Sequence, residues 1–179
     1  MKKIIVPTID QVSPESKVLF EGMQRRLGKV PNLYATMGYS STALKAFLDL
    51  DATLSRGVFN GKQREAIALV VSQLNNCAYC LAGHTVAALK YGLTTDETIG
   101  IRKGYSSDAK INAIVQLAKS IAGNKGHADG ALLQQFFDAG FNEDALMELI
   151  GFIAMRVYTN YAYAATEIPV DFPAAPAID

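Results

Sequence analysis

Helix boundary signals recur from one end of this sequence to the other, and no strand pattern competes with them. The predicted starts carry residues whose side chains cap free N–H groups, as at Ser13, Thr94 and Asp108. Several predicted ends carry glycine, which adopts the left-handed conformation that terminates helices, as at Gly28 and Gly104. The chain is therefore predicted to be all-α.

The predicted helices follow one another closely, over residues 13–28, 31–37, 41–57, 60–74, 76–92, 94–104, 108–123, 129–139 and 142–166. Such short connections favour a compact antiparallel bundle, here of about eight to nine helices. No linker rich in Pro, Gly or Ser divides the chain. Residues 1–179 are therefore predicted to form a single domain, with an N-terminal arm over 1–12 and an irregular tail over 168–179.

A weak internal echo links two parts of the chain. Residues 57–60 (Gly-Val-Phe-Asn) resemble residues 139–142 (Ala-Gly-Phe-Asn), and each segment precedes a predicted buried helix that runs into small and tyrosine residues. The alignment needs a shift of one residue. A duplicated helical hairpin would explain the echo, but the second copy lacks cysteines, so any thiol chemistry belongs to the first.

Charge and hydropathy exclude several classes of protein. Lys plus Arg equals Asp plus Glu, at 17 each, and no basic patch suggests a nucleic-acid partner. No apolar run reaches the roughly 18 residues of a membrane span, and the run at Ile4–Val6 is too short for a signal-peptide core. We therefore expect a cytoplasmic protein without a membrane or nucleic-acid partner. Its low charge and high apolar content also suggest buried interfaces in a homo-oligomer.

Both cysteines and one histidine lie within residues 77–84. On a helix, Cys77, Cys80 and His84 fall within an arc of about 60°. A spacing of three residues lets the two sulfurs approach closely enough to bridge. In a reducing compartment a stable structural disulfide is unexpected, so the CxxC pair indicates a catalytic, redox or metal-binding role.

Glu65 is an isolated carboxylate beside the apolar run 66–71, and burial there is expected to raise its pKa toward neutrality. With His84, Glu65 could then form a proton relay for the thiols. Asn75 or Asn76 is predicted to cap the cysteine-bearing helix. If the helix begins near Asn76, Cys77 lies in its first turn, where the helix dipole favours a thiolate. The residues alone therefore favour Cys77 as the more acidic thiol.

Other interpretations of these residues remain open at this stage. The cysteines could be small buried hydrophobes, Glu65 a solvated surface residue, and His127 a loop residue on the surface. Four side chains also offer zinc ligands, namely Cys77, Cys80, His84 and Glu65. Structural zinc sites usually draw their ligands from separated elements, whereas three of these share one helix. We therefore expect no metal, and the absence of a phosphate-loop pattern gives no reason to expect another cofactor.

The spacing of Glu65, Cys77, Cys80 and His84 resembles the signature of the alkylhydroperoxidase D family, within the carboxymuconolactone decarboxylase superfamily. Residues 29–37 and 44–47 are similar to the N-terminal half of its peroxidase-related members. The C-terminal end is similar at Asn160, Glu167 and Asp171. The decarboxylase branch generally lacks the CxxC pair, so its presence favours the peroxidase branch.

This resemblance implies an all-α fold that assembles into trimers or hexamers. It also implies a thiol-dependent peroxidase for organic hydroperoxides or hydrogen peroxide. Cys80 would attack the peroxide and become a sulfenic acid, Cys77 would resolve it as a disulfide, and Glu65 and His84 would relay protons. A protein or small-molecule dithiol would then reduce the disulfide.

The chain departs from the best-studied members at one position, because Tyr79 stands between the cysteines where they carry a histidine. A tyrosine does not shuttle protons at neutral pH, so weaker peroxidase activity or another reductant would follow. Two alternatives to peroxide reduction are a protein disulfide oxidoreductase and a redox-sensing oligomer whose disulfide changes assembly without turnover.

Overall fold

A computed structural model describes residues 3–178, which contain nine α-helices, one short 3₁₀ helix and no strand. The prediction of an all-α fold is therefore confirmed. After the 3₁₀ helix at Ile9–Gln11, the helices are α1 (Pro14–Leu27), α2 (Asn32–Met37), α3 (Ser41–Leu54), α4 (Gly61–Leu74), α5 (Ala78–Lys90), α6 (Thr95–Lys103), α7 (Ala109–Gly123), α8 (Gly130–Asp138) and α9 (Glu143–Thr166).

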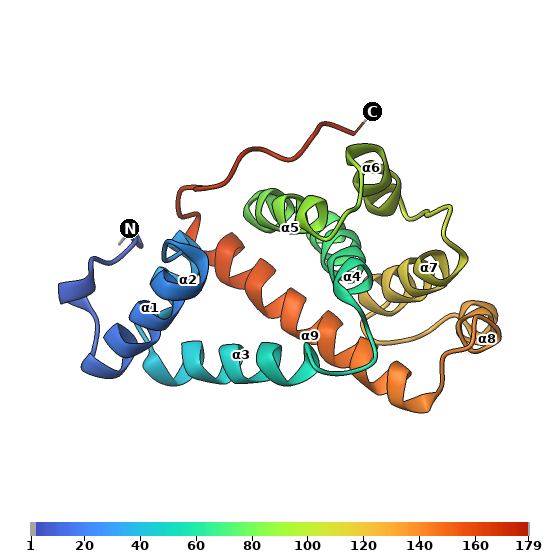
Figure 1. Ribbon diagram of the computed structural model, residues 1–179, viewed down its shortest axis with the longest axis horizontal. Helices are drawn as coiled ribbons and strands as arrows, with labels where there is room; N and C mark the ends of the chain where they lie inside the picture. The colour runs from blue at the N-terminus through green and yellow to red at the C-terminus, as the bar shows by residue number, and fades with distance from the viewer. Residues whose placement is uncertain (1–2, 179) are drawn as a thin grey trace.

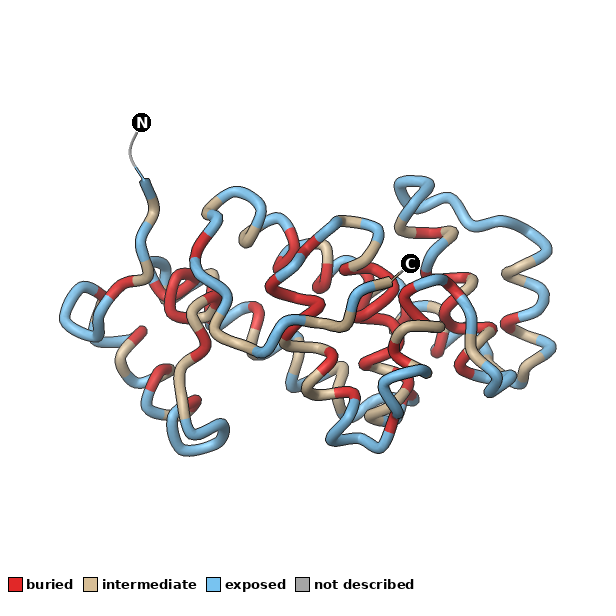
Figure 2. The backbone as a smooth tube through the Cα atoms, turned by 90° about the horizontal axis from the view of Figure 1, so that it is seen from above, coloured by how far each residue is buried: buried red, intermediate tan, exposed pale blue. Residues whose placement is uncertain are grey.

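Helix α4 is the centre of the bundle. It packs against α5, α6, α7 and α9, and every residue from Glu65 to Ser72 is buried. A helix that is apolar on all sides is stable only when other helices surround it. Figure 2 shows the consequence, with buried backbone gathered in the middle of the molecule and exposed turns around it.

Local signals fix most helix boundaries as the sequence indicated. Ser13 accepts a hydrogen bond from the Ser16 N–H at the start of α1, and Gly28 ends that helix with a φ of 76°. Asn60 forms a reciprocal capping box with Gln63 at the start of α4. Helix α3 ends at Leu54 and continues as a turn to Gly57, three residues short of the predicted end.

The two segments that echo each other in sequence have similar roles at the ends of two neighbouring helices. Asn60 caps α4 and Asn142 caps α9. The preceding phenylalanine rings, Phe59 and Phe141, pack with their centroids 5.7 Å apart. The two similar segments therefore lie side by side, at the starts of α4 and α9.

The C-terminal tail crosses the bundle instead of leaving it. Helix α9 ends at Thr166, and Glu167, with a φ of 48°, turns the chain into the tail, which runs past α5 toward α6 (Figure 1). Arg102 of α6 donates a 2.5 Å hydrogen bond to the carbonyl of Pro176 and holds the distal part of the tail. Among residues 3–178, no helix is long and apolar enough to cross a membrane.

Candidate active site

Cys77 and Cys80 form a disulfide at the start of α5, with their Cα atoms 5.3 Å apart. The prediction that an asparagine caps this helix is wrong. Asn76 takes a left-handed conformation with a φ of 51°, which ends the preceding turn, and Cys77 itself is the N-cap. Its Sγ accepts a 3.2 Å hydrogen bond from the backbone N–H of Cys80. Cys77 therefore lies just before the first turn of the helix.

The turn that leads into the cysteines is fixed by a buried amide. Asn160 of α9 accepts a 2.8 Å hydrogen bond from the Asn75 side chain and donates a 3.2 Å hydrogen bond to the Ser72 hydroxyl. Asn160 is itself only 1% exposed. Because a buried amide is costly unless its groups are paired, these bonds hold the end of α4 in one conformation. Asn160 thus fixes the backbone just before Cys77.

His84 and Glu65 are brought together by the packing of α5 on α4. The His84 Nδ1 lies 2.7 Å from the Glu65 Oε2, and Glu65 is 8% exposed. The interpretation of Glu65 as a solvated surface residue is therefore excluded. His127, in contrast, is exposed in the connection between α7 and α8, as the surface interpretation predicted.

The expected rise in the pKa of Glu65 is wrong. Burial by itself raises this pKa, but the charge and hydrogen bond of His84, with the charges of Arg156 and Arg64, lower it below its ordinary value. Glu65 is therefore an ionised hydrogen-bond acceptor at neutral pH. As an acceptor, the Glu65 carboxylate pairs with a proton on Nδ1 of His84, so the imidazole is oriented through that nitrogen.

Cys80, Glu65 and His84 all line one pocket with a volume of about 720 Å³. Its walls come from the end of α1 and the turn after it, from α2, α3, α4, α5 and α9, and from the C-terminal tail. They include Leu27, Pro31, Leu33, Tyr34, Val86 and Phe172. Cys77 does not line this pocket. Such a cavity, largely apolar with a few convergent polar groups, is typical of a site for a small organic molecule.

Tyr79 lies between the two cysteines in the sequence, and its hydroxyl contacts the C-terminal tail. Its hydroxyl accepts a 3.1 Å hydrogen bond from the Leu33 N–H and donates a 2.6 Å hydrogen bond to Asp171 Oδ1. Burial, and then the hydrogen bond to Asp171, raise the pKa of Tyr79 well above its usual range. Tyr79 therefore stays protonated at neutral pH and acts as a structural link.

The tail completes the pocket through Asp171 and Phe172. Lys29 Nζ lies 2.9 Å from Asp171 Oδ2 and 4.0 Å from the centroid of the Phe172 ring. The Phe172 ring also meets the Tyr79 ring edge to face, with centroids 5.6 Å apart. These contacts make a tail residue part of the wall beside Cys80.

Arg156, Tyr34 and Phe172 line the pocket but did not emerge from the sequence as site residues. Arg156 had a usable signal, because it is an isolated charge in the apolar run 152–157, as Glu65 is in its own helix. Phe172 carried no such signal, since the tail that holds it has no periodic pattern.

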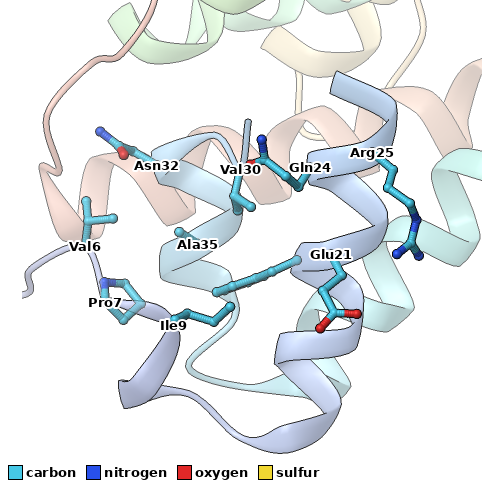
Figure 3. A pocket seen from close by; sticks show the side chains of 10 residues that line it. Val6, Pro7, Ile9, Glu21, Gln24, Arg25, Val30, Asn32 and Ala35 are labelled. Atoms are coloured by element: carbon cyan, nitrogen blue, oxygen red, sulfur yellow. The ribbon is translucent and has the colours of Figure 1, made fainter. Parts of the chain in front are cut away.

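A second cavity, of about 520 Å³, lies away from the cysteines. Figure 3 shows Val6, Pro7 and Ile9 of the N-terminal arm facing side chains of α1 and α2 across it. It contains no cysteine or histidine. Among residues 3–178, no group of three or more His, Cys, Asp and Glu side chains is arranged to hold a metal ion.

Comparison with known proteins gives a family match over part of the chain and a fold over nearly all of it. A model of the carboxymuconolactone decarboxylase family matches residues 41–122, which run from α3 almost to the end of α7. No protein of curated function matches the chain.

Three solved structures of the same fold are similar over nearly the whole chain. An alkylhydroperoxidase AhpD core, an uncharacterized peroxidase-related protein from Ralstonia eutropha JMP134, has a TM-score of 0.83 at 18% identity and covers 93% of this chain and 90% of its own. An uncharacterized peroxidase-related protein from Silicibacter sp. TM1040 has a TM-score of 0.78 at 23% identity, covering 97% and 93%. The debrominase Bmp8 in complex with 2,3,4-tribromopyrrole has a TM-score of 0.79 at 21% identity, covering 96% and 93%.

Proposed function

We propose that the protein is a thiol-dependent peroxidase that reduces organic hydroperoxides or hydrogen peroxide, within the carboxymuconolactone decarboxylase family whose model matches residues 41–122. The observation that carries the proposal is the placement of Cys80 in one pocket with the hydrogen-bonded pair Glu65 and His84. A nucleophile, a proton carrier and a group that orients the carrier are the parts that such a reaction needs. The peroxidase-related proteins of the same fold support the same function.

The two cysteines have different roles in this proposal. Cys80 lines the pocket and Cys77 does not, which supports Cys80 as the thiol that meets the peroxide. The Cys80 thiolate attacks the terminal oxygen of the peroxide, the O–O bond breaks, and the electron pair leaves with the other oxygen as an alcohol or water. Cys77 then attacks the Cys80 sulfenic acid, releases water and closes the disulfide seen here.

His84 moves the protons and Glu65 orients it. In the reduced protein, Nε2 of His84 takes the Cys80 proton and then supplies it to the leaving oxygen. The ionised Glu65 carboxylate stabilises the imidazolium that forms between these steps. The pair thus returns to its starting state after each turnover.

The electron donor and the assembly are also proposals. An external dithiol, protein or small molecule, reduces the disulfide, and a reducing cytoplasm would maintain the cycle. On the outer face of α9, four exposed side chains fall within about 80° of one another, which supports a homo-oligomer, a trimer or hexamer in the family. They are Met147, Ile150, Tyr158 and Tyr161.

Steady-state turnover tests the proposal. Peroxide loss is measured with dithiothreitol as reductant for wild type, Cys80→Ser and Cys77→Ser. We expect turnover in wild type and its loss in Cys80→Ser, which lacks the thiol that attacks the peroxide. In Cys77→Ser no Cys77–Cys80 disulfide can form, so dithiothreitol has to reduce the Cys80 sulfenic acid directly. Equal peroxide loss in wild type and Cys80→Ser would contradict the proposal.

Three alternatives would each give a different experimental result. A protein disulfide oxidoreductase must present its sulfurs to another protein, yet Cys77 and Cys80 are only 2% and 4% exposed, which favours a small substrate. Dithiol-dependent removal of halogen from a heteroaromatic ring is a second candidate, because Bmp8 shares the fold and Tyr34 and Phe172 give the pocket aromatic walls. Bromide release from 2,3,4-tribromopyrrole, without peroxide loss, would favour that candidate. A redox-sensing oligomer would oxidise once without catalytic recycling.

A further inference from the structure

Arg156 is a buried cation with an unused hydrogen-bond donor. It lies on the inner side of α9 and is 5% exposed. Its Nη2 donates a 3.3 Å hydrogen bond to Asp51 Oδ1 on α3. Its Nε is buried, and no group among residues 3–178 accepts a hydrogen bond from it. A buried donor without a partner is rare in folded proteins, and its persistence suggests a partner that binds from outside the chain.

The place of this donor indicates what that partner is. Arg156 lines the same pocket as Cys80, Glu65 and Tyr34, and its charge acts on Glu65. Only one other buried polar side-chain atom in residues 3–178 lacks a partner, the Thr85 hydroxyl, and Thr85 is not among the residues lining the pocket. The unused Nε–H therefore belongs to a side chain that lines the pocket of the proposed nucleophile.

Asp51 engages only one nitrogen of the guanidinium. It accepts a hydrogen bond from Nη2 and balances the charge from α3, while the buried Nε has no acceptor among residues 3–178. A lysine at this position would keep the charge but would lose the planar arrangement of donors. The arrangement is thus suited to a fixed oxygen acceptor more than to a diffuse negative charge.

We propose that Arg156 binds the substrate oxygen that leaves when the peroxide O–O bond breaks. The inference rests on the proposed peroxidase function and adds a substrate-binding residue to it. As the Cys80 sulfur bonds to the terminal oxygen, the electron pair of the O–O bond moves to the other oxygen. Negative charge develops there until His84 supplies a proton. A preoriented cationic donor stabilises this charge in a site that excludes water.

Single-turnover kinetics of the reduced protein test the role of Arg156. We expect Arg156→Lys to slow thiol oxidation by cumene hydroperoxide by about 100-fold, at the lower end of the range seen when one donor to a developing oxyanion is removed. The rate of Cys80 alkylation by iodoacetamide, followed across pH, is expected to stay within twofold of wild type. Arg102→Lys is the matched control, because Arg102 is also buried, at 7% exposure, but does not line the pocket.

The alkylation profile separates substrate binding from a merely structural role. If oxidation by the hydroperoxide is unchanged in Arg156→Lys, the inference is overturned. It is also overturned if alkylation falls as much as peroxide oxidation, because Arg156 would then act on the thiol or on the fold.

Binding of an unreactive probe tests the role of Arg156 independently of peroxidase activity. The probe is 2-phenyl-2-propanol, the alcohol formed from cumene hydroperoxide, titrated by calorimetry into the disulfide form. We expect binding to wild type and at least tenfold weaker binding to Arg156→Lys. If peroxide turnover is absent but this difference is found, the peroxidase function fails and the oxygen subsite stands. Equal binding to both proteins, or none to wild type, would overturn the subsite.

Discussion

The hydroxyl of Tyr79 donates a 2.6 Å hydrogen bond to Asp171, and this bond joins the residue between the two cysteines to the C-terminal tail. The same hydroxyl accepts from the Leu33 N–H, while Asp171 pairs with Lys29. One cluster therefore ties α2, α5 and the tail together beside the pocket. The tyrosine that replaces the histidine of the best-studied members has a structural task here.

Tyr79→Phe is expected to lower the free energy of unfolding by about 1–3 kcal/mol, because it leaves the Leu33 N–H and the Asp171 carboxylate without their shared partner. Urea denaturation measures the change. Tyr105→Phe is a control, since Tyr105 is 59% exposed. A loss no larger than that of the control would show that the cluster contributes little.

Asp171→Asn is expected to remove stability in a pH-dependent way. Burial raises the pKa of Asp171, but the hydrogen bonds from Tyr79 and Lys29 outweigh it and lower the pKa in the folded state. A depressed folded pKa contributes stability above the unfolded pKa of about 3.9, and the contribution is lost as pH falls through the folded value. The difference in unfolding free energy between wild type and Asp171→Asn should therefore shrink below about pH 4. A difference that stays constant from pH 7 to 3 would argue against this.

Glu65→Gln is expected to make the reduced thiol less reactive. Without the carboxylate, the His84 imidazolium that accompanies the thiolate loses its hydrogen-bond partner. A rise of about one unit in the thiol pKa would slow alkylation roughly tenfold at neutral pH. Rates across pH are compared with those of Glu21→Gln, an exposed glutamate on α1. Unchanged alkylation across pH would exclude the relay.

Phe172→Ala is expected to affect bulky substrates selectively. The ring forms part of the wall beside Cys80 and is held by Tyr79 and Lys29. Loss of this apolar contact should reduce kcat/KM for cumene hydroperoxide by about 10-fold, while hydrogen peroxide, which needs no apolar wall, should be little affected. The ratio of the two kcat/KM values is the measurement. An unchanged ratio would mean that substrates do not contact the tail.

Tyr161→Glu is expected to dissociate the proposed oligomer, because it places a charge in the apolar stripe of α9, where Tyr161 is 62% exposed. Light scattering coupled to size exclusion gives the mass of each variant. Tyr105→Glu, on an exposed turn outside the stripe, is the control. A monomeric wild type at micromolar concentration would rule out this interface.

The fold was predictable because its determinants are local. Caps such as Ser13 and Asn60, and terminators such as Gly28, act within a few residues of themselves, so their effect can be read directly from the chain. The start of α5 was placed one to two residues too early, because asparagine caps helices well but also adopts left-handed conformations readily. Asn76 takes the second role, and the cap passes to Cys77.

The site was only partly predictable, because several of its residues come together through contacts between segments far apart in the sequence. Helical spacing placed Cys77, Cys80 and His84 together, and the isolated charge at Glu65 marked its burial. The predicted direction of the pKa shift of Glu65 was wrong, because burial alone was considered. The effects of the neighbouring His84 and Arg156, which lower this pKa, were left out. Phe172 reaches the pocket through a tail without periodicity, and only tertiary structure places it there.

Trapping of the oxidised sulfur in Cys77→Ser tests the central claim most directly. The reduced variant is treated with one equivalent of cumene hydroperoxide in the presence of dimedone, and the labelled residue is identified by mass spectrometry. We expect a dimedone adduct on Cys80, and none on Cys77 when Cys80→Ser is treated in the same way. Labelling of Cys77 alone, or no labelling of either variant, would contradict the central claim.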